Sequence, residues 1–183
     1  MVLKLEENPP TAWPDGIQIS EFTGTWRVAH TKSRNEKALA WQMQKKDISY
    51  FLPMTKKVYR RKGRTFRSLL PLFTGYVFFC GDDDDRVEVL RTNRVANIIE
   101  VKDQSQLVAE LTPIQLALDE GEQLLPHKYI KAGQRCRVIA GPLIGTEGVV
   151  TRAGESMRLV LQVDILGQAT SVEIATDMIE LLE

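Results

Sequence analysis

A long uncharged stretch, Leu69–Cys80, predicts a buried strand at the centre of a sheet. Its aromatic content favours a strand over a buried helix. Because successive side chains of a strand alternate between its two faces, Tyr76 and Phe78 share one face and Val77 and Phe79 share the other. We therefore expect one face to fill a core beneath helices and the other to meet a partner.

Strand and helix patterns alternate along residues 24–120. Besides the stretch above, the strand patterns are Gly24–Thr31, Ile48–Met54 and Asn97–Val101. Helical spacing of apolar residues fills segments between them and recurs over Gln104–Leu118. The resulting order, β-α-β-β-α-β-α, predicts an α+β sandwich in which helices pack on a small sheet.

Three local signals predict where helices begin. Ser33 and Glu36 stand three residues apart, the spacing of a capping box. The acidic run Asp82–Asp85 predicts an N-cap and a first turn that favours negative charge. Metal ligation is the alternative, but the run lacks the glycine and glutamate of a calcium loop. Thr112 followed by Pro113 predicts that the last helix breaks and restarts there.

The pattern changes from Gly133 onwards to short alternating strands separated by turns. The stretch from Met157 to Val163 alternates strictly with period two. Several strands in so short a segment predict a small closed β-barrel, since closure removes exposed edges.

These patterns divide the chain into four parts. Residues 1–23 carry three prolines without periodicity and read as a flexible leader, and residues 24–120 form the α+β domain. Residues 121–130, with Pro126, read as a linker, and residues 131–183 form the barrel.

The overall charge, the length of the apolar runs and the number of cysteines narrow the class of protein. Acidic and basic residues balance, so the formal net charge is zero and any electrostatic function must be local. No uncharged apolar run approaches the roughly 18 residues of a membrane helix, and no signal peptide opens the chain, so no membrane contact is expected. Cys80 and Cys136 are isolated in apolar segments, which favours core packing in a reducing cytoplasm.

The segment from Lys56 to Arg67 concentrates positive charge, because seven of its twelve residues are Lys or Arg. One interpretation is a solvated hairpin whose charges prevent edge aggregation. The other is a nucleic-acid-binding finger that contacts phosphates. In that case the binding residues are its seven cations: Lys56, Lys57, Arg60, Arg61, Lys62, Arg64 and Arg67.

Two segments carry a resemblance to a known family. GPLIGTEG at 141–148, with its flanking valines, resembles a KOW motif, and ILGQATSVEI at 165–174 resembles the next hairpin of a NusG C-terminal barrel. Upstream, Trp26, Leu52-Pro53, the basic segment and LFTGYVFF resemble the NusG N-terminal (NGN) domain. The basic hairpin is closer to specialised RfaH-type paralogues, although Thr74 replaces a usual proline and His30 a usual tyrosine.

The resemblance implies a bacterial transcription elongation or antitermination factor. Its N-terminal domain would bind the clamp helices of RNA polymerase through an apolar pocket, with core packing as the alternative for each aromatic. The candidates are Trp26, His30, Phe73, Tyr76 and Phe78. The basic hairpin would lie near DNA at the transcription bubble, and the protein would act as a monomer.

The barrel's expected partner is a ribosomal protein or a termination factor. Leu143 and Ile144, at the tip of the first barrel loop, would contact it, unless they bury each other across the barrel mouth. The segment from Lys131 to Glu183 has five basic and seven acidic residues, so we expect the barrel to bind phosphates poorly.

Two rival classes remain. One is a KOW-type RNA-binding or ribosome-associated protein without polymerase contact, which predicts RNA affinity in the barrel. The other is an enzyme, and we expect none, since no nucleophile with its base and no metal-ligand spacing is evident. No cofactor and no metal are expected.

Overall fold

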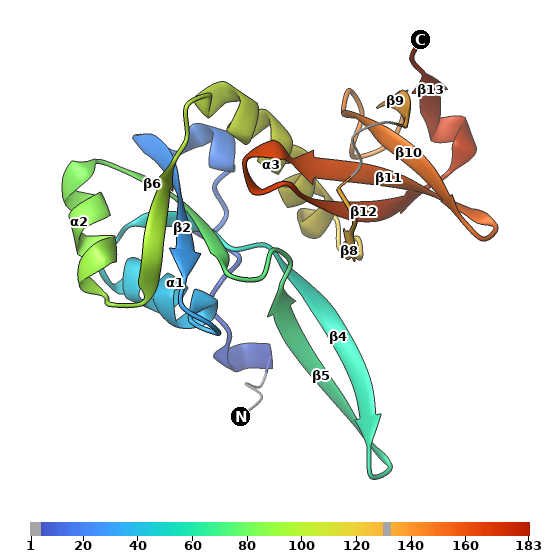
Figure 1. Ribbon diagram of the computed structural model, residues 1–183. Helices are drawn as coiled ribbons and strands as arrows, with labels where there is room; N and C mark the ends of the chain where they lie inside the picture. Colours follow the sequence, from blue (N-terminus) through green and yellow to red (C-terminus); the bar gives the residue numbers. More distant parts are fainter. Residues whose placement is uncertain (1–4, 130–132) are drawn as a thin grey trace. The chain divides into compact units, whose positions relative to one another are not determined.

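The chain divides into two compact units, Met1–Gln104 and Ser105–Glu183. The structure is a computed structural model that describes residues 5–129 and 133–183 (Figure 1). We call the unit Met1–Gln104 the sandwich unit and the unit Ser105–Glu183 the strand-rich unit. The expected boundary after residue 120 differs from this division, because all but the first residue of helix α3 (Gln104–Asp119) groups with the strands that follow. The predicted α+β class is confirmed.

The sandwich unit is built on a five-stranded antiparallel sheet. Its order is β1 (Ala12–Trp13), β3 (Ser49–Phe51), β6 (Tyr76–Gly81), β2 (Thr25–Thr31) and β7 (Val95–Glu100). The central strand is β6, as predicted, but it begins only at Tyr76. The first residues of the uncharged stretch instead end strand β5, and a turn separates the two.

The helices α1 (Glu36–Lys45) and α2 (Asp83–Arg91) cover one face of this sheet. Val77 and Phe79 of β6 lie in one buried cluster with Leu39 of α1 and Val89 of α2. The alternation predicted for β6 is therefore confirmed. The alternate residues of this strand, among them Phe78, belong to the opposite face of the sheet.

The expected flexible leader differs from the structure over its described residues. The 3-10 turn η1 (Leu5–Glu7) precedes β1, which pairs with β3, and η2 (Ile19–Glu21) follows. The carbonyl of Pro10 accepts a hydrogen bond from the hydroxyl of buried Tyr50 at 2.8 Å, and Ile19 is fully buried. A stretch rich in proline can thus be held by its carbonyl groups without any side-chain periodicity.

Two of the three predicted helix starts are wrong. The N-cap of α1 is Asn35, without a side-chain cap, so Ser33 and Glu36 form no capping box. Helix α3 runs unbroken through Pro113, and the Thr112 hydroxyl donates at 2.7 Å to the carbonyl of Val108 inside it. That bond to the preceding turn replaces the expected cap of a new helix.

The start of α2 is as predicted. The side chain of Asp82 accepts from the amide of Asp85 at 2.8 Å, and Asp85 accepts from the amide of Asp82 at 3.0 Å. The two bonds form a capping box, which explains part of the acidic run structurally. Among the described residues no helix is long and apolar enough to cross a membrane.

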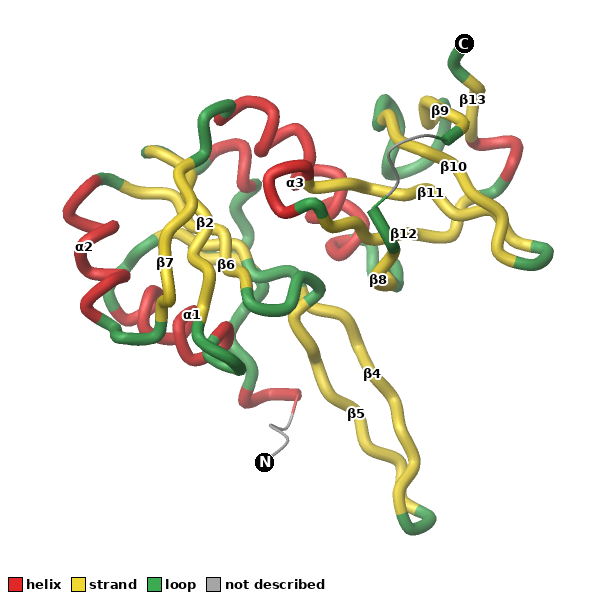
Figure 2. Tube along the Cα trace, in the orientation of Figure 1, coloured by secondary structure: helices red, strands yellow, loops and turns green. Residues whose placement is uncertain are grey.

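A separate two-stranded ribbon interrupts the sandwich. Within the described residues, strands β4 (Met54–Arg61) and β5 (Arg64–Pro71) pair only with each other, and they extend away from the five-stranded sheet in Figure 2. Lys62 and Gly63 connect them with positive φ angles of 50° and 74°. Such a two-residue loop matches the twist of an antiparallel hairpin.

The strand-rich unit carries one six-stranded antiparallel sheet after α3. Its strands, in sheet order, are β13 (Ile179–Leu181), β9 (Gln134–Val138), β10 (Glu147–Ala153), β11 (Ser156–Val163), β12 (Gln168–Ile174) and β8 (Leu125–His127). The short 3-10 segments η3 (Asp164–Leu166) and η4 (Thr176–Met178) flank β12. The predicted strands are present, but pairing between described residues leaves β13 and β8 as edges instead of closing the barrel.

The expected linker is partly structured in its described residues. Leu125 pairs with Ser171 as part of β8, and the hydroxyl of Thr170 donates to its carbonyl at 2.9 Å. Asp164 of η3 accepts from Tyr129 at 2.9 Å and from Gln106 of α3 at 3.0 Å. Backbone pairing and these side-chain hydrogen bonds attach the segment to its own unit. No hydrophobic periodicity in the sequence indicates them.

Candidate protein-binding and nucleic-acid-binding surfaces

Three side chains form a row across the sheet face opposite α1 and α2. We call His30 on β2, Tyr76 on β6 and Asn97 on β7 the His30–Tyr76–Asn97 row. The rings of His30 and Tyr76 stack with centroids 5.0 Å apart, and His30 Nδ1 lies 3.0 Å from Asn97 Oδ1. Both rings are partly exposed and Asn97 is exposed. The row thus presents aromatic and amide groups that a protein partner can contact.

A tight turn immediately before Tyr76 holds this row. Gly75 has a φ of +87°, in the left-handed region that favours glycine. Its amide donates at 2.7 Å to Glu36 Oε1, and its carbonyl accepts from the amide of Thr31 at 2.8 Å. Glu36 is buried, so this charge-assisted bond links α1 to the turn away from water. The sequence analysis missed this role because it assigned Glu36 to a cap.

The other three predicted polymerase-binding residues are buried. Trp26 is 3% exposed, Phe73 1% and Phe78 0%. The ring of Phe78 meets Phe73 edge-on at 6.0 Å and tilts against Phe51 at 6.4 Å between centroids. The expectation that Phe78 is exposed beside Tyr76 is therefore wrong, because these aromatics cover it. Of the five predicted residues, only His30 and Tyr76 reach the surface.

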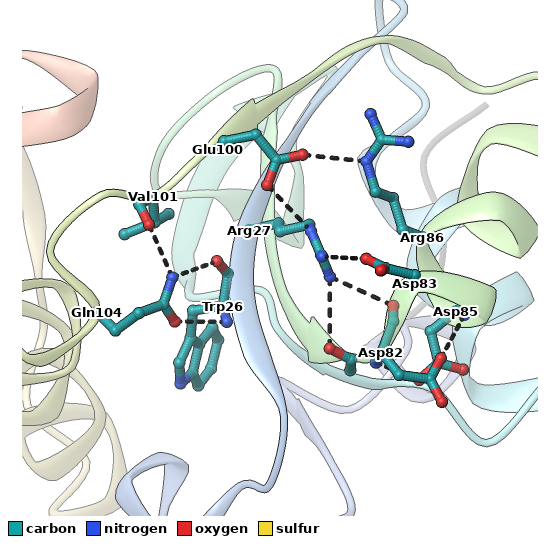
Figure 3. Close-up of polar contacts among 10 residues, drawn as sticks. Trp26, Arg27, Asp82, Asp83, Asp85, Arg86, Glu100, Val101 and Gln104 are labelled. Carbon is teal, nitrogen blue, oxygen red and sulfur yellow. Dashed lines mark hydrogen bonds and ion pairs between the residues drawn. The ribbon is translucent and has the colours of Figure 1, made fainter.

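The backbone of Trp26 is clamped by a side-chain amide at the start of α3 (Figure 3). Gln104 Oε1 accepts from the Trp26 amide at 2.6 Å, and Gln104 Nε2 donates to the Trp26 carbonyl at 2.9 Å. The same nitrogen donates to the carbonyl of Val101 at 2.8 Å. The amide of Gln104 thereby extends the hydrogen bonding of β2, and the indole is stacked on Phe22.

The acidic run after β6 provides hydrogen-bond acceptors for the buried side chain of Arg27. Arg27 donates to Asp83 at 2.7 Å and to Glu100 at 3.1 Å, and Arg86 also donates to Glu100, at 3.0 Å (Figure 3). Arg27 further donates to the carbonyl of Asp82 at 3.3 Å. Within the described part of the chain, no group of three or more His, Cys, Asp or Glu is placed to hold a metal.

The predicted nucleic-acid-binding cations are together on the β4–β5 ribbon. Its seven Lys and Arg residues are exposed, and among the described residues none of them makes an ion pair or side-chain hydrogen bond. Positive charge here is therefore available to an external anion.

The loop predicted to contact the barrel's partner presents one of its two residues. Ile144 is 66% exposed, whereas Leu143 is buried, so the expectation that both face a partner is wrong for Leu143. Ile139 and Met178 are further exposed apolar residues, and the Ile139 amide donates to the Met178 carbonyl at 2.9 Å. The sequence analysis missed this pair because the two residues, one just after β9 and the other in η4, are distant in sequence.

Two arginines of the strand-rich sheet share one carboxylate. Arg137 donates to Glu147 at 2.6 Å and Arg135 donates to it at 3.2 Å. The hydrogen bond from Arg137 lowers the pKa of Glu147. Arg158 instead donates to Ser171 at 2.8 Å. These three arginines are thus engaged within their own sheet.

Comparison with known proteins places residues 24–117 in one family. The model for NusG, described as "Transcription termination factor nusG", matches these residues, about half of the chain. A comparison with curated proteins found no match. Among solved structures, a chain of "Crystal Structure of MjSpt4:Spt5 complex conformation B" is similar with 18% identity and a TM-score of 0.28. That similarity covers 86% of this chain and 97% of the other.

Proposed function

This chain belongs to the NusG family of transcription factors, and we propose that its sandwich unit binds RNA polymerase during transcript elongation. The observation that carries the proposal is the His30–Tyr76–Asn97 row, which lies inside the matched region and presents a partly exposed aromatic stack. Partly exposed aromatic residues are frequent anchors of protein interfaces.

The site of contact on the polymerase is its clamp helices. Tyr76 and His30 make the contact, since both reach the surface. Phe73 and Phe78 lie buried against each other and support the strand from which Tyr76 projects. Trp26 has the same supporting role at the other end of β2, through its bonds with Gln104.

The β4–β5 ribbon contacts DNA near the transcription bubble. Its cations are exposed and carry no internal partner among the residues described, so they can neutralise phosphates. The long basic ribbon also favours a specialised RfaH-type role, such as antitermination or antipausing, over the housekeeping one.

The strand-rich unit binds a ribosomal protein or a termination factor through the apolar loop of Ile144. The alternative of an RNA-binding protein without polymerase contact is less well supported, because Arg135 and Arg137 are already paired with Glu147. The protein acts as a monomer, without enzymatic activity, in the cytoplasm, where its free, buried cysteines stay reduced.

Binding of the full chain to purified RNA polymerase tests the proposal. We expect Tyr76→Ala to weaken binding by about 30-fold, the effect of losing one interface anchor of about 2 kcal/mol. Tyr129→Ala is the matched control, since Tyr129 lies in the strand-rich unit and bonds to Asp164. Its affinity should remain that of the wild type.

Two results would contradict the proposal. One is a wild-type chain that does not bind the polymerase. The other is a Tyr76→Ala chain that melts like the wild type and still binds with wild-type affinity.

A further inference from the structure

The two faces of the β4–β5 ribbon differ in chemistry. Cross-strand partners of an antiparallel pair lie on the same face, and faces alternate along each strand. One face carries the pairs Lys57–Ser68, Tyr59–Phe66 and Arg61–Arg64. The other carries the pairs Lys56–Leu69, Val58–Arg67 and Arg60–Thr65. Both faces are cationic, but aromatic rings occur on only the first of them.

The two rings on the aromatic face form an exposed stack. The centroids of Tyr59 and Phe66 are 5.4 Å apart, with an interplanar angle of 15°. Phe66 is 39% exposed and Tyr59 is partly exposed. Among the described residues neither ring stacks on a further aromatic ring, and both rings are accessible to an external group.

Cations lie on both sides of this stack. Lys57 and Arg61 are each two residues from Tyr59, about 7 Å along the strand. Arg64 is directly opposite Arg61. An aromatic surface between cations fits a chain that alternates flat bases with phosphates, and a duplex hides the faces of its bases.

We propose that the Tyr59–Phe66 face of the ribbon binds single-stranded nucleic acid, with unpaired bases stacked on the two rings and phosphates on Lys57, Arg61 and Arg64. The inference rests on the proposed nucleic-acid contact of the ribbon and specifies its ligand. The opposite face, with Val58 in place of the rings, binds phosphates of any strand.

Fluorescence anisotropy with the full chain tests this assignment. The probes are a labelled oligonucleotide of about 12 nucleotides as single-stranded DNA, single-stranded RNA, blunt duplex and abasic strand, a length within the range of single-strand sites. We expect single strands to bind more tightly than the duplex or the abasic strand. The variant Tyr59→Leu/Phe66→Leu should lose at least about fivefold in single-strand affinity, as expected for one lost stacked base, with an unchanged salt slope.

The matched control removes charge from the opposite face. Arg60→Gln/Arg67→Gln should weaken single strands and duplex alike and flatten the dependence on salt. A loss confined to the DNA or to the RNA probe identifies the strand type and supports stacking in either case.

Equal affinity for single strands and duplex, or an unchanged single-strand affinity in the leucine variant, would overturn the inference. Ultraviolet cross-linking of the wild type gives an independent reading, with adducts expected at Tyr59 or Phe66 and adducts only elsewhere as the contrary result. Polymerase binding through Tyr76 is measured separately, so the proposed function can stand when the stacking inference fails.

Discussion

Glu36 holds the turn that carries Tyr76, so its removal should destabilise the sandwich unit. The buried carboxylate accepts the Gly75 amide at 2.7 Å, and Glu36→Ala leaves that amide without this acceptor. A hydrogen bond to a charged group contributes about 1.5–3 kcal/mol. The charge also lies at the first residue of α1, where the helix dipole adds about 0.3–1 kcal/mol. The expected loss is therefore about 2–4 kcal/mol.

Urea unfolding followed by tryptophan fluorescence measures this loss. All three tryptophans, Trp13, Trp26 and Trp41, lie in the sandwich unit, so the signal reports that unit alone. Glu36→Gln is the matched control, since it keeps an acceptor oxygen without the charge. It should retain a neutral hydrogen bond of about 0.5–1.5 kcal/mol and unfold between the wild type and Glu36→Ala.

An unchanged midpoint and slope for Glu36→Ala would refute the reasoning. It would mean that the turn keeps its geometry through Gly75 and the Thr31 amide alone. Equal losses in Glu36→Gln and Glu36→Ala would instead show that the charge, and not the acceptor, is what the turn needs.

Three further predictions concern burial and charge. Phe78→Ala should cost about 3–5 kcal/mol of stability, because it empties a fully buried site. Burial alone raises the pKa of Glu100, but hydrogen bonds from two arginines outweigh it and lower that pKa. Its contribution to stability is thus present above about pH 4.3 and lost as the pH falls, and Glu100→Gln should flatten that fall. Burial raises the pKa of the Cys80 thiol to about 11 and also raises that of Cys136, so both should resist alkylation until their units unfold.

Each of these has a direct check. Urea titration that places Phe78→Ala within about 1 kcal/mol of the wild type would show that the site is not packed. If Glu100→Gln loses stability in acid as steeply as the wild type, the hydrogen bonds from the two arginines to Glu100 do not contribute to the pH dependence of stability. Rapid alkylation of either thiol at neutral pH in the folded chain would contradict its burial.

Features that depend only on residues close together in the sequence were predicted well. The alternation of Val77 and Phe79 against Tyr76 and Phe78 follows from strand geometry alone, and β6 shows it. The capping box of Asp82 is equally local, since its partner is three residues away.

Burial was harder to predict, because it depends on residues that meet only in three dimensions. Phe78 and Tyr76 share a face, yet Phe73 and Phe51 cover only the first. Glu36 bonds to a turn that is 39 residues away, which its spacing from Ser33 could not indicate. The ribbon's cations were predictable as a charged run, but the Tyr59–Phe66 stack depends on the strand register.

The central claim is that this chain acts on RNA polymerase through the Tyr76 surface of its sandwich unit, and a single-round elongation assay tests it most directly. The wild-type protein, added to a halted elongation complex, should change pause lifetimes or elongation rate, and Tyr129→Ala should act like it. The Tyr76→Ala variant, once tryptophan fluorescence shows that it is folded, should have little effect at the same concentration. Wild-type protein without any effect on elongation, or Tyr76→Ala with full effect, would contradict the account.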